Sequence, residues 1–208
     1  MRKALSVLSV VACAMLMVAC ARSHTKVVQA HMNEDYADRR IRDVMVIAVV
    51  EDHRVRTILE KHFVDWFDAL GVEAINSLDA LPMDDDSQLE KADILAVLEK
   101  YENDTVVITH LVGFRESEVF SRDRPRFYGN YFGFYRYTWG YATWPTIYGE
   151  RAQFNIETRL YDAKTESLIW AGELKLVNPK TTGEAIGQVV KTVMLELDKA
   201  GLLPERAP

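Results

Sequence analysis

Hydrophobic and polar positions divide the chain into predicted strands and helices. Residues 43–50 form an almost continuous apolar run rich in β-branched side chains. Such a run is typical of a strand buried on both faces, as in a parallel sheet. Apolar side chains at helical spacing follow over residues 55–70, with Asp52 as the predicted N-cap and Gly71 at the predicted end of the helix.

The next apolar segments continue this alternation. They predict a short strand over residues 72–75 and a longer strand over residues 105–112. Between them, Ser87 and Glu90 have the spacing of a capping box, which predicts the start of a helix that reaches Leu98. Because strands and helices alternate, the first three strands are expected to be parallel and joined by helical crossovers.

The C-terminal part of the chain changes to a period of two. Residues 153–160 and 168–176 alternate apolar and polar side chains around a turn at residues 162–165, which predicts an antiparallel hairpin with one buried face. Thr181 and Glu184 predict the cap of a last helix. The sequence therefore predicts an α/β (α+β) fold: a single mixed sheet in the order β-α-β-α-β-β-β-α, with the hairpin at one edge and three covering helices.

Residues 1–19 have the layout of a bacterial lipoprotein signal peptide. Arg2 and Lys3 supply the positive n-region, and residues 4–19 form an uncharged apolar run. Met17-Val18-Ala19-Cys20 resembles a lipobox, at which lipoprotein signal peptidase cuts and the cysteine is acylated with fatty acids such as palmitate. We therefore expect Cys20 to be the lipidated first residue of the mature protein.

Two alternatives for this leader remain open. Cys13 ends a second lipobox-like match, although cutting there would leave an h-region of only about nine residues. The second alternative is a membrane-spanning helix, although the apolar run over residues 4–19 is shorter than the roughly 20 residues that such a helix needs. The residue after Cys20 is Ala21. By resemblance to Gram-negative lipoproteins, an Asp at this position would signal retention in the inner membrane. The expected location is thus the outer membrane, facing the periplasm.

Composition narrows the partners of the mature chain. Both cysteines lie at or before the predicted cleavage site, so no disulfide and no cysteine-based metal site is expected. Without Arg2 and Lys3, 23 of the 25 basic residues remain against 31 acidic ones, a net charge of −8. An acidic protein gains nothing from approaching a phosphate backbone, so nucleic acid is not an expected partner.

The mature chain is expected to form one domain behind a short linker. Residues 20–42 are polar without a sustained period, which predicts a lipidated cysteine and a tether, with at most a turn of helix over residues 27–32. Residues 43–203 form the predicted single domain, and residues 121–150 interrupt it as an insertion.

This insertion is rich in aromatic residues. Residues 127–148 hold eleven of the 21 aromatic side chains of the chain. In an extended strand, Tyr135, Tyr137, Trp139 and Tyr141 would share one face. The candidate contact residues are Tyr131, Tyr135, Tyr137, Trp139, Tyr141 and Trp144.

Three interpretations of the insertion remain open. It can fold back and cover an open edge or face of the sheet. It can be a contact surface for a protein, since Tyr and Trp dominate interface hot spots. It can also stack on the sugar rings of peptidoglycan or another glycan, or lie at a lipid interface, where Trp and Tyr concentrate.

The search for catalytic chemistry gives no strong candidate. The chain has no phosphate-binding glycine loop, nucleophile elbow or His-Glu-x-x-His pair. His62 and His110 are interpreted as structural residues of a helix and a strand, and residues 84–86 as a solvated acidic run before a helix. Glu116 and Glu118 could form a carboxylate pair for glycoside chemistry. We expect no catalytic residue, metal or cofactor.

Two resemblances add to this picture. The aromatic insertion, followed by Ile156–Asp162, Ala163-Lys164-Thr165 and Leu168–Gly172, resembles a family of uncharacterised bacterial outer-membrane lipoproteins. In that family a Tyr/Trp/Gly-rich loop precedes a C-terminal hairpin. The N-terminal half is similar to the α/β domains of periplasmic assembly lipoproteins, such as curli secretion factors and penicillin-binding-protein activators.

Together, these observations predict a non-enzymatic outer-membrane lipoprotein that acts as a binding or adaptor protein in cell-envelope assembly or maintenance. Its partners would be the membrane, through the N-terminal lipid, and an envelope protein. The alternatives are a glycan- or peptidoglycan-binding lipoprotein that uses the aromatic segment and, as a third class, an envelope hydrolase.

Overall fold

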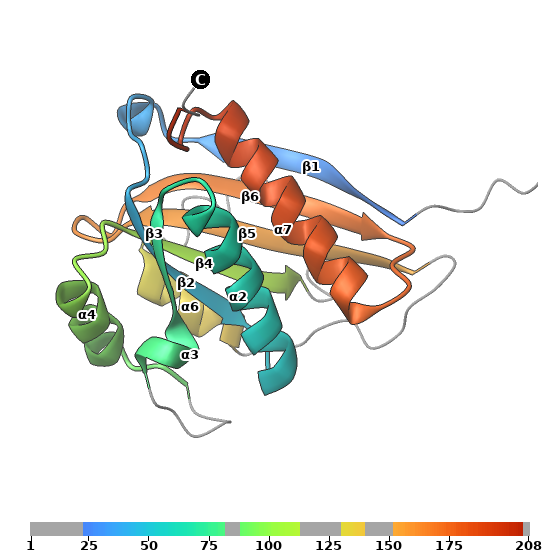
Figure 1. The fold of residues 1–208 in the computed structure, drawn as a ribbon, viewed down its shortest axis with the longest axis horizontal. Helices are drawn as coiled ribbons and strands as arrows, with labels where there is room; N and C mark the ends of the chain where they lie inside the picture. The colour runs from blue at the N-terminus through green and yellow to red at the C-terminus, as the bar shows by residue number, and fades with distance from the viewer. Residues whose placement is uncertain (1–22, 82–87, 113–129, 140–151, 206–208) are drawn as a thin grey trace, which may run out of the picture.

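The computed structural model describes residues 23–81, 88–112, 130–139 and 152–205. Six strands form one mixed sheet in the spatial order β1-β6-β5-β4-β2-β3 (Figure 1). The strands are β1 (His24–Met32), β2 (Asp43–Val49), β3 (Glu73–Asn76), β4 (Thr105–Val112), β5 (Gln153–Asp162) and β6 (Leu168–Val177). The helices are η1 (Glu34–Tyr36), α2 (His53–Asp68), α3 (Ser77–Ala80), α4 (Lys91–Lys100), α6 (Tyr131–Trp139) and α7 (Thr182–Lys199).

The predicted parallel half of the sheet is confirmed. Strand β2 pairs in parallel with β3 on one side and with β4 on the other. Every residue of β2 after Asp43 is buried, as its continuous apolar run predicts. Helix α2 connects β2 to β3, and α3 and α4 lie between β3 and β4.

The predicted hairpin is confirmed as well. Strands β5 and β6 pair antiparallel, and β5 also pairs antiparallel with β4. The Asp162 carboxylate accepts hydrogen bonds from the backbone N–H groups of Lys164 and Thr165 and from the Thr165 hydroxyl, at 3.0, 2.7 and 2.9 Å. This short-range network closes the turn, as is typical of Asp at such positions.

Strand β1 corrects the prediction of a tether. Residues 24–32 form a nine-residue strand that pairs antiparallel with β6 and therefore occupies the sheet edge that was expected for the hairpin. Seven of the nine residues are exposed, so no apolar period marks the strand in the sequence. The leader, Cys20 and the rest of residues 1–22 lie outside the described residues.

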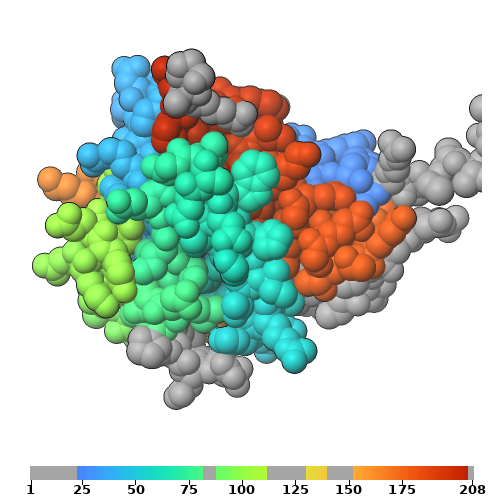
Figure 2. All heavy atoms as spheres, viewed as in Figure 1, coloured from blue at the N-terminus to red at the C-terminus, as the bar shows by residue number. Residues whose placement is uncertain are grey.

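Helices cover both faces of the sheet. Helices α2 and α7 lie side by side on one face, as Figures 1 and 2 show, and bury a core that includes Phe63, Phe67 and Val193. Helices α4 and α6 pack on the opposite face, mainly over β2 and β4, where Ile94 and Phe134 are among the buried side chains. The three predicted helices are present, and α3 and α6 add to them.

The helix starts show which capping predictions hold. The Asp52 carboxylate accepts from the N–H groups of Arg54 and Val55, and the Thr181 hydroxyl accepts from Glu184 N–H at 3.1 Å, as predicted. Helix α4 is different, because it begins at Lys91 with Glu90 as its N-cap. Glu90 therefore occupies the cap position itself rather than the third position after a Ser87 cap.

Candidate functional site

The described part of the aromatic insertion is a helix that packs on the sheet. Four residues of α6 are fully buried, at the helical spacing that puts them on one face: Tyr131, Phe134, Tyr135 and Thr138. The three aromatic residues among them belong to the same core cluster as side chains of β2, β4 and α4. The open interpretation in which the insertion covers a sheet face therefore holds for residues 131–139.

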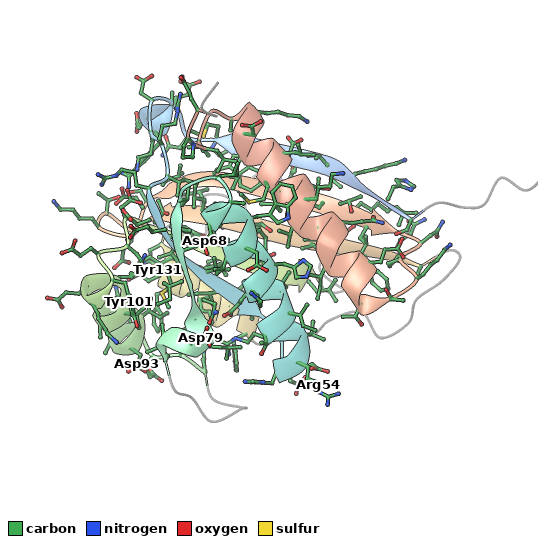
Figure 3. All side chains as sticks on the ribbon, in the orientation of Figure 1. Arg54, Asp68, Asp79, Asp93, Tyr101 and Tyr131 are labelled. Carbon is green, nitrogen blue, oxygen red and sulfur yellow. The ribbon has the colours of Figure 1, made fainter. Side chains whose placement is uncertain are left out.

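This burial corrects the prediction for two of the six candidate contact residues. Tyr131, labelled in Figure 3, and Tyr135 are both 0% exposed and cannot belong to an exposed contact surface. Burial raises the pKa of each phenol to about 12. The Tyr135 hydroxyl accepts a hydrogen bond from the backbone N–H of Leu89 at 2.8 Å, which ties α6 to the segment before α4. The Tyr131 hydroxyl has no hydrogen-bond partner among the described residues.

The other side of α6 faces outward. Arg136 is exposed, and Tyr137 and Trp139 are half-buried. Trp139 packs against Tyr135, with ring centroids 5.7 Å apart. On this helix Tyr137 and Trp139 flank Arg136 on its two sides, instead of sharing one face as the extended-strand spacing of Tyr135, Tyr137, Trp139 and Tyr141 suggested. Tyr141 and Trp144 lie outside the described residues.

A buried polar cluster lies beneath α6. His110 Nε2 is 3.3 Å from Glu157 Oε2, and Arg159 Nε donates to Glu157 Oε1 at 2.7 Å. Phe134 of α6 covers both side chains: the Arg159 guanidinium lies 4.0 Å from its ring centroid, and the His110 ring meets it edge-on at 5.4 Å. Glu157 and Arg159 are therefore buried, although their alternation in the sequence put them on the open face of β5.

The hydrogen-bond partners of this cluster indicate its charges. His110 Nδ1 lies 3.0 Å from the Leu111 carbonyl oxygen, so both ring nitrogens lie within hydrogen-bond distance of an oxygen. Burial opposes ionisation of Glu157, but the hydrogen bonds and charges of His110 and Arg159 outweigh it and lower the pKa of Glu157. Burial also disfavours the charged form of Arg159. The negative charge of Glu157 outweighs this effect of burial and raises the pKa of Arg159.

The cluster continues across the sheet. Glu157 pairs in register with Glu173 of β6, and Gln29 of β1 is the next register partner along the row. Glu173 is 7% exposed, and its carboxylate accepts from Gln29 Nε2 at 3.3 Å. Two carboxyl groups therefore lie side by side at this level of the sheet.

A second buried ion pair holds the start of α2. Arg56 Nε donates to Glu60 Oε1 at 3.1 Å, and Ser77 bridges the two as acceptor from Arg56 and donor to Glu60. Glu60 also accepts from the N–H groups of Ala48 and Leu78. Burial raises the pKa of Glu60 despite these donors. The hydrogen bonds of this cluster join α2 and α3 to β2. The sequence did not predict the cluster, because Arg56 and Glu60 lie on a helix of otherwise ordinary amphipathic pattern.

The remaining candidates for chemistry have mixed outcomes. His62 is half-buried on α2, as expected for a packing residue. Residues 84–86, Glu116 and Glu118 lie outside the described residues. Within the described ranges, no group of three or more His, Cys, Asp or Glu side chains has a metal-binding arrangement, and no helix has the length and apolar character to cross a bilayer.

Comparison with known proteins gives similarity of structure only. No protein-family model matches the chain, and no curated protein matches it. Similar solved structures include the PelC dodecamer from Paraburkholderia phytofirmans, at 8% identity and a TM-score of 0.46 over 88% of this chain and all of that one. A variant of the same PelC has 7% identity and a TM-score of 0.43, covering 82% and 95% of the two chains.

Lipoprotein GNA1162 from Neisseria meningitidis is also similar, at 12% identity and a TM-score of 0.38 over 76% of this chain and 99% of that one. Identities and scores this low carry no residue roles from these proteins to this chain.

Proposed function

We propose that this chain is a lipid-anchored protein of the bacterial outer membrane, facing the periplasm, that acts by binding a protein of the cell envelope rather than by catalysis. The anchor would be the acylated Cys20. The contact surface would be the outward side of α6, formed by Arg136, Tyr137 and Trp139, which we call the α6 outer face.

One observation carries this proposal: α6 divides its aromatic side chains between two roles. Tyr131 and Tyr135 fill the core, whereas Tyr137 and Trp139 stay partly exposed beside the exposed Arg136. Tyr, Trp and Arg are the residue types enriched in interface hot spots. The inward residues fix the helix on the sheet, so the outer face is held rigid and loses little entropy on binding.

The polar clusters support binding over catalysis. The Glu157 carboxylate is buried and already accepts from Arg159, with the His110 ring at its other oxygen. Glu60 is likewise buried and accepts from four groups. A general acid or base must reach the proton of a substrate, and these carboxylates are occupied by their own neighbours.

Site-specific photo-crosslinking tests the proposal in intact cells. A photo-reactive phenylalanine derivative is introduced at Tyr137, and a matched variant carries it at Tyr101. Tyr101 is 39% exposed at the end of α4, which packs on the same face of the sheet as α6, and is labelled in Figure 3. The expected result is a defined protein adduct at Tyr137 and none at Tyr101.

Other outcomes refute the assignment. Adducts of equal yield at both positions would mean nonspecific contact. Co-sedimentation of the protein with isolated peptidoglycan, lost in a Tyr137→Ser, Trp139→Ser variant that stays folded, would replace the protein partner with a glycan.

A further inference from the structure

The sheet begins only a few residues after the proposed lipid anchor. Gln188 of α7 donates to the Ser23 hydroxyl at 2.7 Å and lies 3.3 Å from the Thr25 hydroxyl, so the chain is fixed to the domain from Ser23 onward. Cys20 is three residues earlier in the sequence, and three residues of fully extended chain span at most about 11 Å. A lipid on Cys20 therefore holds this edge of the sheet close to the bilayer surface.

The edge of the sheet nearest Cys20 is strand β1, which is exposed and partly apolar. Strand β1 is an edge strand, and Val27 and Val28 are 37% and 54% exposed. A bulge between Val27 and Gln29 interrupts its pairing with β6. An exposed nine-residue edge with two consecutive valines favours association unless another surface covers it.

The same edge carries two lysines side by side. Lys26 and Lys175 are direct register partners on β1 and β6, and they lie on the sheet face opposite α7. Like charges placed directly opposite each other on paired strands are destabilising. Neither lysine takes part in an ion pair among the described residues, and the neighbouring acidic side chain on their face of β6 is Glu173, two positions before Lys175. In a chain with an acidic net charge, this pair is a local exception.

We propose that the β1 edge surface, formed by Val27 on the α7 side of the edge strand, Val28 at its bulge and the Lys26–Lys175 pair on the other side, rests edge-on on the membrane and contacts anionic phospholipid headgroups. The inference rests on the proposed lipid anchor and adds the orientation of the domain. The short connection supplies proximity, the lysine pair supplies charge complementarity to the headgroups, and the two valines meet the interface where apolar side chains are favourable.

Fluorescence quenching by spin-labelled lipids measures this orientation. The mature chain holds no cysteine other than Cys20, so an introduced cysteine is a unique thiol when Cys20 is acylated. One variant, Val28→Cys, carries the fluorophore on the β1 edge surface. The matched control, Glu73→Cys, carries it at an exposed position of β3, five inter-strand spacings or about 24 Å across the sheet. Both acylated proteins are incorporated into vesicles of phosphatidylcholine and phosphatidylglycerol that contain a headgroup nitroxide.

The expected result is loss of most of the emission at position 28 and little change at position 73. Adding Lys26→Glu and Lys175→Glu should restore emission at position 28 in these anionic vesicles. Equal quenching at the two positions, stronger quenching at position 73, or a dimer that protects position 28 without lipid would overturn the proposal. The mass of each protein is measured first: absence of the acyl chains refutes the anchor itself, whereas an acylated protein without quenching at position 28 refutes only the docking.

Discussion

The substitution Glu157→Gln tests how much the buried polar cluster beneath α6 stabilises the domain. Glutamine keeps the shape of the side chain and removes its negative charge. Arg159, which is 2% exposed, and the His110 ring, which is 1% exposed, would then lack their carboxylate partner. Removing one partner of a buried ion pair costs about 3–5 kcal/mol, and we expect the lower end of that range because glutamine still accepts hydrogen bonds.

Urea unfolding at neutral pH measures the effect. With a typical slope of about 2 kcal/mol per molar urea, a loss of about 3 kcal/mol lowers the midpoint by about 1.5 M. The matched control is Asp65→Asn, which removes the carboxylate of an exposed ion pair with Lys61 and should leave the midpoint unchanged. If the midpoint of the Glu157→Gln protein stays within about 0.3 M of the wild type, a small fraction of that shift, the buried cluster does not stabilise the domain.

The same variant has a defined pH dependence. The pKa of Glu157 is lower in the folded protein than the ordinary glutamate value of 4.5. Its contribution to stability is therefore fully present above that ordinary value and is lost as the pH falls through the lowered folded-state pKa. The difference in unfolding free energy between wild type and Glu157→Gln should thus shrink in acid, and a difference that grows below pH 4.5 would contradict the assigned charges.

Two paired comparisons extend the test to packing, each measured by thermal and urea unfolding. Gly172→Ala should destabilise the protein by about 1–3 kcal/mol, because the new Cβ would overlap the buried indole ring of Trp170. Gly187→Ala in α7 places its Cβ where no atom lies within 4 Å, so it should stabilise the protein by up to about 1 kcal/mol. Equal effects at the two glycines would contradict the packing. Tyr135→Phe should cost about 1–3 kcal/mol, because it leaves a buried backbone N–H unpaired, and Tyr131→Phe should be neutral or stabilising, because that hydroxyl has no described partner. A larger cost at Tyr131 would reveal a partner for its hydroxyl.

Much of the fold was predictable where burial imposes a period on the side chains. Strand β2 is buried on both faces and reads as an unbroken apolar run, and the β5–β6 hairpin has its turn marked by Asp162. Caps at Asp52 and Thr181 were predictable because their hydrogen bonds join residues two or three positions apart. Short-range hydrogen bonds and a half-buried surface can both be recognised from the order of residues in the sequence.

Strand β1 and helix α6 show why the rest was missed. The edge strand β1 is held by backbone hydrogen bonds to β6 and exposes most of its side chains, so its sequence is polar and lacks a period. In α6 six of the nine positions are aromatic, which hides the helical spacing of Tyr131 and Tyr135 behind an apparent period of two. The charge of Glu157 favoured an exposed position, and only the long-range packing of α6 makes that position buried.

The central claim is that Cys20 carries a lipid that holds the domain at the outer membrane. Intact-mass and palmitate-labelling analysis of the protein purified from membranes of a Gram-negative host tests it directly. The account predicts a chain that begins at Cys20, carries acyl chains and fractionates with the outer membrane, and a Cys20→Ser variant that takes up no palmitate. A chain that retains residues 1–19, or a cleaved chain without fatty acid that is released freely, would contradict it.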